Sequence, residues 1–235
     1  MGLPCFIGRV LDNKIIIENE EYHHAINVKR LKLNDRIEVN DLSGNFFVGT
    51  IYKIEKNSLI VIIEETVKKI PSRINITLYQ CLLNKLSKID ELIESISQLN
   101  VTTFVPVMPT FSSLKSKDIQ NKIQKWQKIA IQSIKQCKRL FPVNIQNPQK
   151  LYNIDPIENL KIVFYENEKN KTLKDINIQN INSLAIIIGP EGGFSKDEIT
   201  YLQKKGFIPL SLSDNILKTE IATIVALSQI ELKFR

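Results

Sequence analysis

The pattern of hydrophobic and polar positions along the chain changes character near residue 70. Before this point, short β-branched runs alternate with turn residues, as in strands that follow one another closely. Strands are expected at residues 14–17, 36–39, 46–51 and 59–63. A helix over residues 20–31, with Asn19 as its cap and two glutamates in its first turn, interrupts them. Closely spaced short strands predict a small β-barrel over residues 1–70.

From residue 74 onwards, the pattern alternates between strands and helices. Strands are expected at residues 74–79, 103–107, 160–165 and 183–188, with one more ending near Leu212. Helices are expected at 87–99 and 118–139, and after each of the last strands, with the final helix running to about Lys233. The fourth strand is apolar without interruption, as strands buried on both faces of a parallel sheet are. Residues 74–235 therefore predict an α/β domain with a largely parallel sheet.

Composition narrows the class of protein only slightly. The chain has 235 residues with a net charge of +7, and this basic excess favours an anionic partner as much as simple solubility. The longest apolar run is too short to cross a membrane, and the start lacks the pattern of a secretory signal. Three distant cysteines, and two adjacent histidines without a third ligand, predict neither a disulfide nor a metal site. We therefore expect a cytoplasmic protein.

The most informative segment is residues 188–198, IGPEGGFSKDE. A buried strand ends at Gly189, a glycine-rich loop follows, and Ser195 and Glu198 have the capping-box spacing of a helix start. Such a loop lies at the carboxyl end of a parallel strand, where open α/β sheets bind ligands. It has neither the Gly-Lys-Ser/Thr of a Walker loop nor the spacing of the dinucleotide fingerprint. A ligand-binding loop and a simple strand-to-helix turn both fit the pattern.

A second segment, residues 210–222, has the sequence LSLSDNILKTEIA and combines a strand end, a polar loop and a helix start. Lys218 and Glu220 lie at the junction of loop and helix, where an exposed charged pair is the commoner outcome. The last helix carries more apolar residues than one buried side requires. Its small Ala222 and Ala226 would let another helix approach closely, so we expect a packed partner surface there.

Together, residues 189–195 (GPEGGFS) and 216–222 (ILKTEIA) closely resemble the signature of the RsmE-type 16S rRNA uridine-N3 methyltransferases, members of the SPOUT superfamily of trefoil-knotted enzymes. Residues 24–31 (HAINVKRL) are similar to the N-terminal motif of this family. Residues 126–130 (WQKIA) and 136–139 (QCKR) are similar to its central helix. Four motifs in the same order make the resemblance specific, and it covers nearly the whole chain.

The resemblance implies an α/β fold in which a PUA-like β-barrel, residues 1–70, binds RNA and precedes a trefoil-knotted SPOUT domain, residues 74–235. It implies N3-methyluridine in the decoding region as the product, 16S rRNA or the small ribosomal subunit as the partner, and a homodimer formed through the last helix. It also implies S-adenosylmethionine as the cofactor, held by two loops. Their residues are Ile188, Gly189, Pro190, Glu191, Gly192, Gly193, Ser211, Leu212, Ile216, Leu217 and Thr219.

Three residues of these loops are candidates for the chemistry. Methyl transfer depends mainly on the positioning of an in-line nucleophile, and uridine N3 must also lose a proton. Glu191 and Glu220 are candidates for the base or an orienting group. Lys218 is a candidate for stabilising negative charge that develops on the uracil oxygens. The sequence does not choose among these three residues.

Basic residues outside the loops are candidates for RNA binding, because neutralisation of phosphates dominates affinity for nucleic acids. The alternative for the long helix is a solvated basic face. The candidates are His24, Lys29 and Arg30 in the N-terminal motif, and Lys125, Lys128 and Arg139 on the long helix.

The chain departs from the family pattern at several positions. Lys for Arg at Lys218 keeps the charge but loses the bidentate fork. These departures leave open whether activity is reduced. They also keep two alternatives open: a non-catalytic RNA-binding or ribosome-assembly protein on the same fold, and a knotted methyltransferase that acts on another RNA site. The departures are at Ser95, Gln98, Asn100, Thr110, Phe111, Ser213, Lys218 and Ile221.

Overall fold

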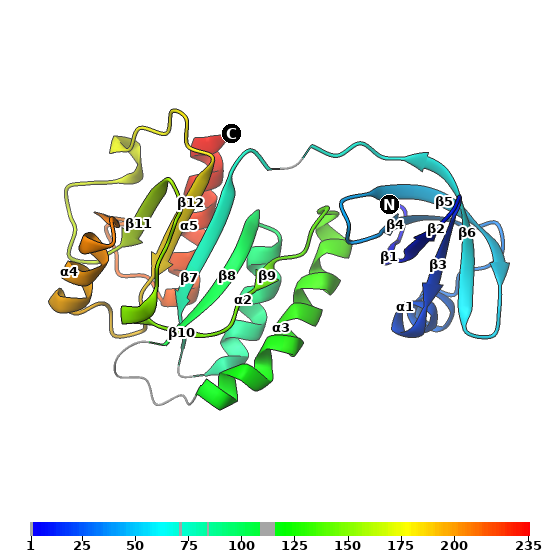
Figure 1. The fold of residues 1–235 in the computed structure, drawn as a ribbon, viewed down its shortest axis with the longest axis horizontal. Coiled ribbons are helices and arrows are strands. Elements are labelled where there is room, and N and C mark those ends of the chain that lie inside the picture. The colour runs from blue at the N-terminus through cyan, green and yellow to red at the C-terminus, as the bar shows by residue number, and fades with distance from the viewer. Residues whose placement is uncertain (1, 71, 84, 109–115) are drawn as a thin grey trace. The chain divides into compact units, whose positions relative to one another are not determined.

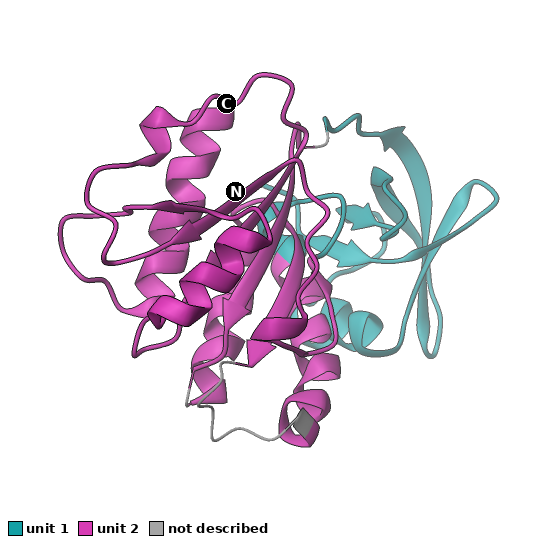
Figure 2. Ribbon diagram, turned by 60° about the vertical axis from the view of Figure 1, so that its left-hand side comes forward, with its two compact units in different colours: residues 1–71, 134–142 teal, residues 72–133, 143–235 magenta. Residues whose placement is uncertain are grey.

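The computed structural model describes residues 2–70, 72–83, 85–108 and 116–235. Its contacts divide the chain into two compact units (Figure 2). The first unit is Met1–Pro71 with Ile134–Pro142, and the second is Ser72–Ser133 with Val143–Arg235. The last residues of the long helix α3, Ser116–Cys137, therefore belong to the first unit.

The first unit contains a six-stranded sheet with the order β1-β4-β5-β6-β3-β2. Neighbouring strands are antiparallel except for the parallel pair β1 and β4. The four predicted strands are confirmed, whereas β1 and β2 were not predicted because three residues are too few for a periodic pattern. The strands are β1 Cys5–Ile7, β2 Arg9–Leu11, β3 Lys14–Glu18, β4 Arg36–Asn40, β5 Phe46–Ile54 and β6 Ser58–Thr66.

The predicted helix over residues 20–31 is wrong in its form and in its cap. A short helix α1, Asn19–His23, continues as a π-helix, His24–Val28. Asn19 is the first helical residue with φ 55°, and Glu18 holds the cap position without a side-chain hydrogen bond. A π turn contains one extra residue. This wider turn lets the fully buried Ala25 and the half-buried Leu31 both pack against the sheet.

The second unit contains a seven-stranded sheet that is parallel throughout, with the order β10-β8-β7-β12-β11-β13 and β9 beside β8 (Figure 1). The predicted parallel sheet is confirmed. Instead of the predicted helix, only a three-residue 3-10 turn, Leu173–Asp175, is found between β11 and β12. The strands are β7 Asn75–Cys81, β8 Val101–Met108, β9 Asn144–Ile145, β10 Gln149–Lys150, β11 Leu160–Phe164, β12 Ser183–Ile188 and β13 Ile208–Leu210. The helices are α2 Leu86–Ser97, α3, α4 Lys196–Lys204 and α5 Thr219–Phe234.

Side chains of β12 alternate between two hydrophobic cores, one on each face of this sheet. Ile186 packs in the core that contains residues of α2, α3 and α5, while Ile187 packs in the core that contains residues of α4. Burial on both faces explains why the strand reads as an unbroken apolar run. Helices occupy both faces, so the carboxyl edge of the sheet is the place where loops can form a site.

The last helix, α5, buries a different side from the one that its sequence suggested. Ala226 is fully buried in the core of its own unit, so its predicted place on a partner surface is wrong. The outward stripe instead contains Ile221, Val225, Ser228 and Leu232, of which Ile221 and Leu232 are 48% and 78% exposed. The small alanine lets α5 lie close to its own sheet. No helix in the described part of the chain is long and apolar enough to cross a membrane.

Candidate functional site

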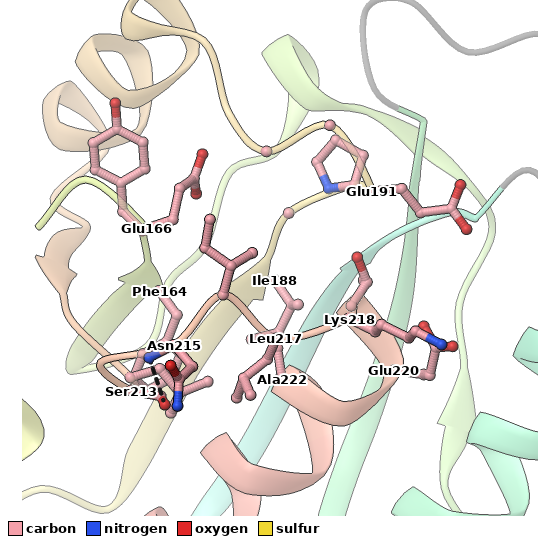
Figure 3. A pocket seen from close by; sticks show the side chains of 18 of the residues that line it. Phe164, Glu166, Ile188, Glu191, Ser213, Asn215, Leu217, Lys218, Glu220 and Ala222 are labelled. Atoms are coloured by element: carbon pink, nitrogen blue, oxygen red, sulfur yellow. Dashed lines mark hydrogen bonds between the residues drawn. The ribbon is translucent and has the colours of Figure 1, made fainter.

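A cavity of about 550 Å³ opens at the carboxyl ends of β11, β12 and β13 in the second unit (Figure 3). Every residue that the sequence assigns to the cofactor loops or to the chemistry lines this cavity, Lys218 and Glu220 included. They meet because β11 lies between β12 and β13 in the sheet, so the loops after the last two strands share one edge. Ser213 and Asn215, which lie within the second predicted loop, also line the cavity. The sequence did not indicate its other lining residues, which are Lys88, Phe164, Tyr165, Glu166, Lys169 and Ala222.

The glycine loop has a defined conformation that anchors one wall of the cavity. Gly193 donates its backbone N–H to the carbonyl of Pro190 at 3.0 Å and has a φ of 71°, which favours glycine. The predicted capping box is confirmed: Glu198 N–H donates to Ser195 Oγ at 3.2 Å, and Ser195 N–H donates to the Glu198 carboxylate at 2.9 Å. The start of α4 is thereby fixed.

Two neighbouring glycines of this loop have different surroundings. A Cβ at Gly193 would overlap the carboxylate of Glu166, besides the strain of its positive φ. A Cβ at Gly192 would meet no protein atom within 4 Å. Because Gly192 lines the cavity, the space beside its backbone is space that a ligand can occupy.

The second predicted cofactor loop, which follows β13, is held by hydrogen bonds to the segment that follows β11 and to α5. Ser211 N–H donates to the carbonyl of Lys171 at 2.7 Å, and Gln229 of α5 donates to the carbonyl of Leu212 at 3.2 Å. Ser213, a departure from the family pattern, accepts the backbone N–H of Asn215 at 3.2 Å through Oγ. A serine thus stabilises a turn that glycine would leave free. The trefoil knot implied by the resemblance stays a prediction.

Two carboxylates and one lysine form a charged cluster at one side of the cavity. Figure 3 shows Glu191 and Glu220 on the same side, with Glu166 opposite. Lys88 Nζ lies 3.4 Å from Glu191 Oε1 and 3.2 Å from Glu220 Oε1. The other oxygen of Glu220, Oε2, is buried and has no hydrogen-bond donor among the described residues. A buried acceptor without a donor is rare in native proteins, so this oxygen invites a donor from outside the chain.

The charges around Glu220 keep its carboxyl group ionised. Its own backbone N–H holds the pKa below the ordinary value of 4.5, and Lys88 and Lys218 lower it further. The pKa of Lys88 is raised in turn, mainly by its hydrogen bond to Glu220. At neutral pH Glu220 is therefore a carboxylate and Lys88 an ammonium group, with Lys218 exposed beside them.

The comparisons with known proteins identify the family. Residues 70–231 match the family described as RNA methyltransferase domain, and residues 17–64 match the one described as RNA methyltransferase PUA domain. The ribosomal RNA small subunit methyltransferase E of Aquifex aeolicus is 32% identical over 220 residues, which are 92% of this chain and 93% of the relative. This chain belongs to the ribosomal RNA small subunit methyltransferase E family of RNA methyltransferases.

Solved structures agree with this assignment. A protein of Legionella pneumophila that is described by its structure as a methyltransferase candidate, solved in complex with the bound cofactor SAM, is 25% identical with a TM-score of 0.88, covering 99% of this chain and 98% of its own. A ribosomal RNA small subunit methyltransferase E of Neisseria gonorrhoeae, solved with S-adenosyl methionine, shares the fold at a TM-score of 0.88 and 23% identity, covering 99% and 98% of the two chains. The predicted fold class, a PUA-like domain before an α/β methyltransferase domain, is confirmed.

Besides Ser213, four departures of this RNA methyltransferase from the family pattern lie among the described residues of α2, its end and α5. Asn100 follows α2 with a φ of 57°, a conformation that glycine or asparagine adopts at the end of a helix. Ser95 donates its hydroxyl to the carbonyl of Glu91 one turn earlier. Gln98 caps the C-terminus of α2, and Ile221 lies on the outward stripe of α5. Thr110 and Phe111 lie outside the described residues.

The residues predicted for RNA binding in this RNA methyltransferase are divided between the two units. The first unit contains His24, Lys29, Arg30 and Arg139, and the second contains Lys125 and Lys128. Burial, followed by the charge of Lys135, lowers the pKa of His24. Arg30 is exposed and has a φ of 55°.

Of the basic residues predicted on the long helix, Lys125 is paired at the surface, whereas Arg139 lies beyond the end of α3 at Cys137. Lys125 forms an ion pair with Asp90 at 2.6 Å. The half-buried Arg139 has a pKa lowered by burial, and its carbonyl accepts a hydrogen bond from Asn40 at 2.7 Å. Among the described residues, no group of three or more His, Cys, Asp or Glu side chains is arranged to hold a metal ion.

Proposed function

We propose that the protein transfers a methyl group from S-adenosylmethionine to N3 of a uridine in the decoding region of 16S rRNA. The observation that carries this proposal is that the glycine loop, the second loop and an ionised carboxylate converge on the same cavity. Relatives named as methyltransferases of small-subunit ribosomal RNA supply the substrate class. We expect the reaction to occur in the cytoplasm, where ribosomal subunits are assembled.

The residues of the cavity fit S-adenosylmethionine. A volume of about 550 Å³ lies within the range of small-molecule sites. Ile188, Leu212 and Leu217 offer apolar surface for an adenine ring, and the open space at Gly192 lets a ligand reach the backbone. Glu220 Oε2 provides an acceptor that lacks a donor. When bound, the cofactor supplies an electrophilic methyl group on a sulfonium.

Glu220 is the residue that we propose to accept the N3 proton. Its carboxyl is ionised, and one of its oxygens has no donor in the described part of the chain. The proton must leave before the methyl group takes the same in-plane position on N3. The nitrogen then forms the new N–C bond as the S–C bond breaks, so a carboxylate and a sulfonium become a carboxylic acid and a thioether. Lys218 is suited to stabilise negative charge on a uracil oxygen.

Residues 1–70 are proposed as the RNA-binding domain and residues 74–235 as the methyltransferase domain. The exposed Lys29 and Arg30 follow the π-helix of the first unit, and π-helical turns are frequent at functional sites. Their charges would neutralise phosphates. Because N3 is on the Watson–Crick edge, the target uridine must be unpaired or extruded.

A symmetric homodimer through α5 is the proposed assembly. The outward stripe of Ile221, Val225 and Leu232 offers an apolar face, and a two-fold axis requires such a patch to pair with itself. Val225→Glu should give a monomer in sedimentation, because an unpaired charge in the contact is costly. Lys204→Glu, on the exposed side of α4, is the matched control and should stay dimeric. A wild-type protein that sediments as a monomer at micromolar concentration contradicts the proposal.

The function is tested with small ribosomal subunits from a strain that lacks this gene. After incubation with the purified protein and S-adenosylmethionine, nuclease digestion and mass spectrometry should detect N3-methyluridine, and primer extension should stop at one decoding-region uridine. Methylation of another nucleotide would favour a different RNA site. Absence of both methylation and cofactor binding, measured by calorimetry, would favour the non-catalytic RNA-binding protein.

A further inference from the structure

Lys88 contacts both loops of the cavity, although it belongs to neither. It is the third residue of α2, and its ammonium lies within 3.4 Å of Glu191 in the glycine loop and within 3.2 Å of Glu220 at the start of α5. These two carboxylates are 29 residues apart in the sequence and follow different strands. The lysine is therefore the common partner of the two segments that border the cavity.

The backbone of Lys88 is held firmly by the core beneath it. The next residue, Ile89, is fully buried in the hydrophobic core that also contains residues of α5. The side chain itself is 36% exposed. Ion pairs with this exposure contribute little to the stability of a protein. The contacts of Lys88 therefore contribute little to folding, and their main effect is to position the carboxylates of Glu191 and Glu220.

We propose that Lys88 is a positioning residue for methyl transfer: its ammonium joins Glu191 to Glu220 and fixes the Glu220 carboxylate in the place and the charge state that proton removal requires. This inference rests on the proposed function, since it assigns Lys88 to the same reaction. It adds a residue that neither cofactor loop contains and that acts through Glu220 rather than on the substrate.

The charges that surround Glu220 determine what removal of Lys88 would do. Its own backbone N–H, Lys88 from α2 and Lys218 at the cap position of α5 favour its negative charge, whereas its burial favours the neutral form. Without Lys88 one attraction is lost while the effect of burial remains, so the pKa of Glu220 rises. A base with a raised pKa is protonated at higher pH, and the acid limb of the rate profile moves upward with it.

The experiment compares Lys88→Met, which keeps most of the length of the side chain but loses the charge, with Lys88→Arg and Lys85→Met. Lys85 is exposed, precedes α2 and forms no ion pair with a described residue, so it is the matched control. Methylation kinetics are measured from about pH 3 to 8, because the pKa of Glu220 lies below its ordinary value of 4.5 and the acid limb follows it. Carbon-13 labelled glutamate is titrated by NMR in each variant, with Glu220→Gln assigning the Glu220 signal, and this readout does not require turnover.

Lys88→Met should lower kcat about 100-fold with KM for RNA nearly unchanged, a loss typical of general base catalysis. It should also raise both the acid limb and the NMR titration of Glu220 by about one pH unit. Lys88→Arg should restore most of the rate, and Lys85→Met should resemble the wild type. An unchanged Glu220 titration, or a kcat within about twofold of the wild type, would overturn the role of Lys88. A wild-type protein that methylates no uridine would overturn the proposed function itself, whatever the titration gives.

Discussion

The cavity of the second unit and the basic residues proposed for RNA binding differ in how the chain assembles them. The cavity gathers segments from residues 88 to 222 at one edge of a parallel sheet. The basic residues are divided between two units, and one of them, Lys125, is engaged in an ion pair with Asp90. The sheet brings the loops after parallel strands together at one edge. The spacing of lysines along a helix, by contrast, does not determine which lysines remain available to bind RNA.

The largest expected effect is on the rate at the cavity. Glu220→Gln should lower kcat about 1,000-fold, because an amide cannot accept the N3 proton. The affinity for S-adenosylmethionine, measured by calorimetry, should change little. Glu191→Gln is the comparison within the same cluster and should cost less than about tenfold. Equal losses of kcat for the two variants would contradict the proposal that Glu220, and not Glu191, accepts the proton.

Cofactor affinity should respond next, at Gly192. Gly192→Val adds a side chain to space that is free of protein atoms, so the protein should fold normally while its affinity for S-adenosylmethionine falls about 100-fold, or ~2.7 kcal/mol. Gly192→Ala should give a smaller loss of the same kind. Gly193 is the poorer test, because its φ of 71° strains any side chain there. A folded Gly192→Val protein with wild-type affinity would remove this loop from the cofactor site.

In the first unit, a buried ion pair should affect the stability of the protein rather than its affinity for RNA. Lys135 Nζ lies 2.8 Å from Glu21 Oε1, and the two side chains are 9% and 14% exposed. Glu21→Gln leaves the lysine without its charged partner and should lower the free energy of unfolding by about 2 kcal/mol, the value of a hydrogen bond to a charged group. Glu18→Gln, at an exposed position, is the control. Urea unfolding monitors the loss, and identical midpoints for the two variants would contradict it.

The smallest expected effect separates the two groups of basic residues. Lys29→Glu with Arg30→Glu should weaken RNA binding and reduce the slope of log affinity against log salt by about one to two units. Lys125→Glu should reduce it less, because Asp90 already neutralises that ammonium. Binding titrations at several salt concentrations measure both slopes. A larger change for Lys125→Glu would place the RNA along α3 instead.

Much of the fold was predictable because local rules determine it. The unbroken apolar strands, the capping box at Ser195 and the glycine loop each have a pattern with one main structural explanation. The site needed the resemblance as well, since spacing alone could not bring Gly192 and Leu217 to one cavity. Lys88 was missed because its partners are more than 100 residues away and only the packing of α2 on α5 brings them together.

Two errors had the same physical origin, in packing that a sequence does not display. Ala226 belongs to an apolar helix, and the sequence does not reveal which side of that helix its own sheet covers. The helix over residues 20–31 was expected to be regular, but the packing of Ala25 and Leu31 is accompanied by a π turn. In both cases the sequence shows the helical period, but it does not show the neighbouring surface against which one face of the helix packs.

The inclusion of Ile134–Pro142 in the first unit has a consequence for the order in which the protein is made. Asn40 donates to the carbonyls of Arg139 and Leu140, and Glu21 and Glu38 bind Lys135 and Lys138. A nascent chain that has left the ribosome only as far as residue 70 lacks all of these partners. The N-terminal unit therefore completes its fold only after more than half of the protein has been synthesised. During that interval Lys135 and Lys138, which pair with Glu21 and Glu38 in the folded protein, have not yet been translated.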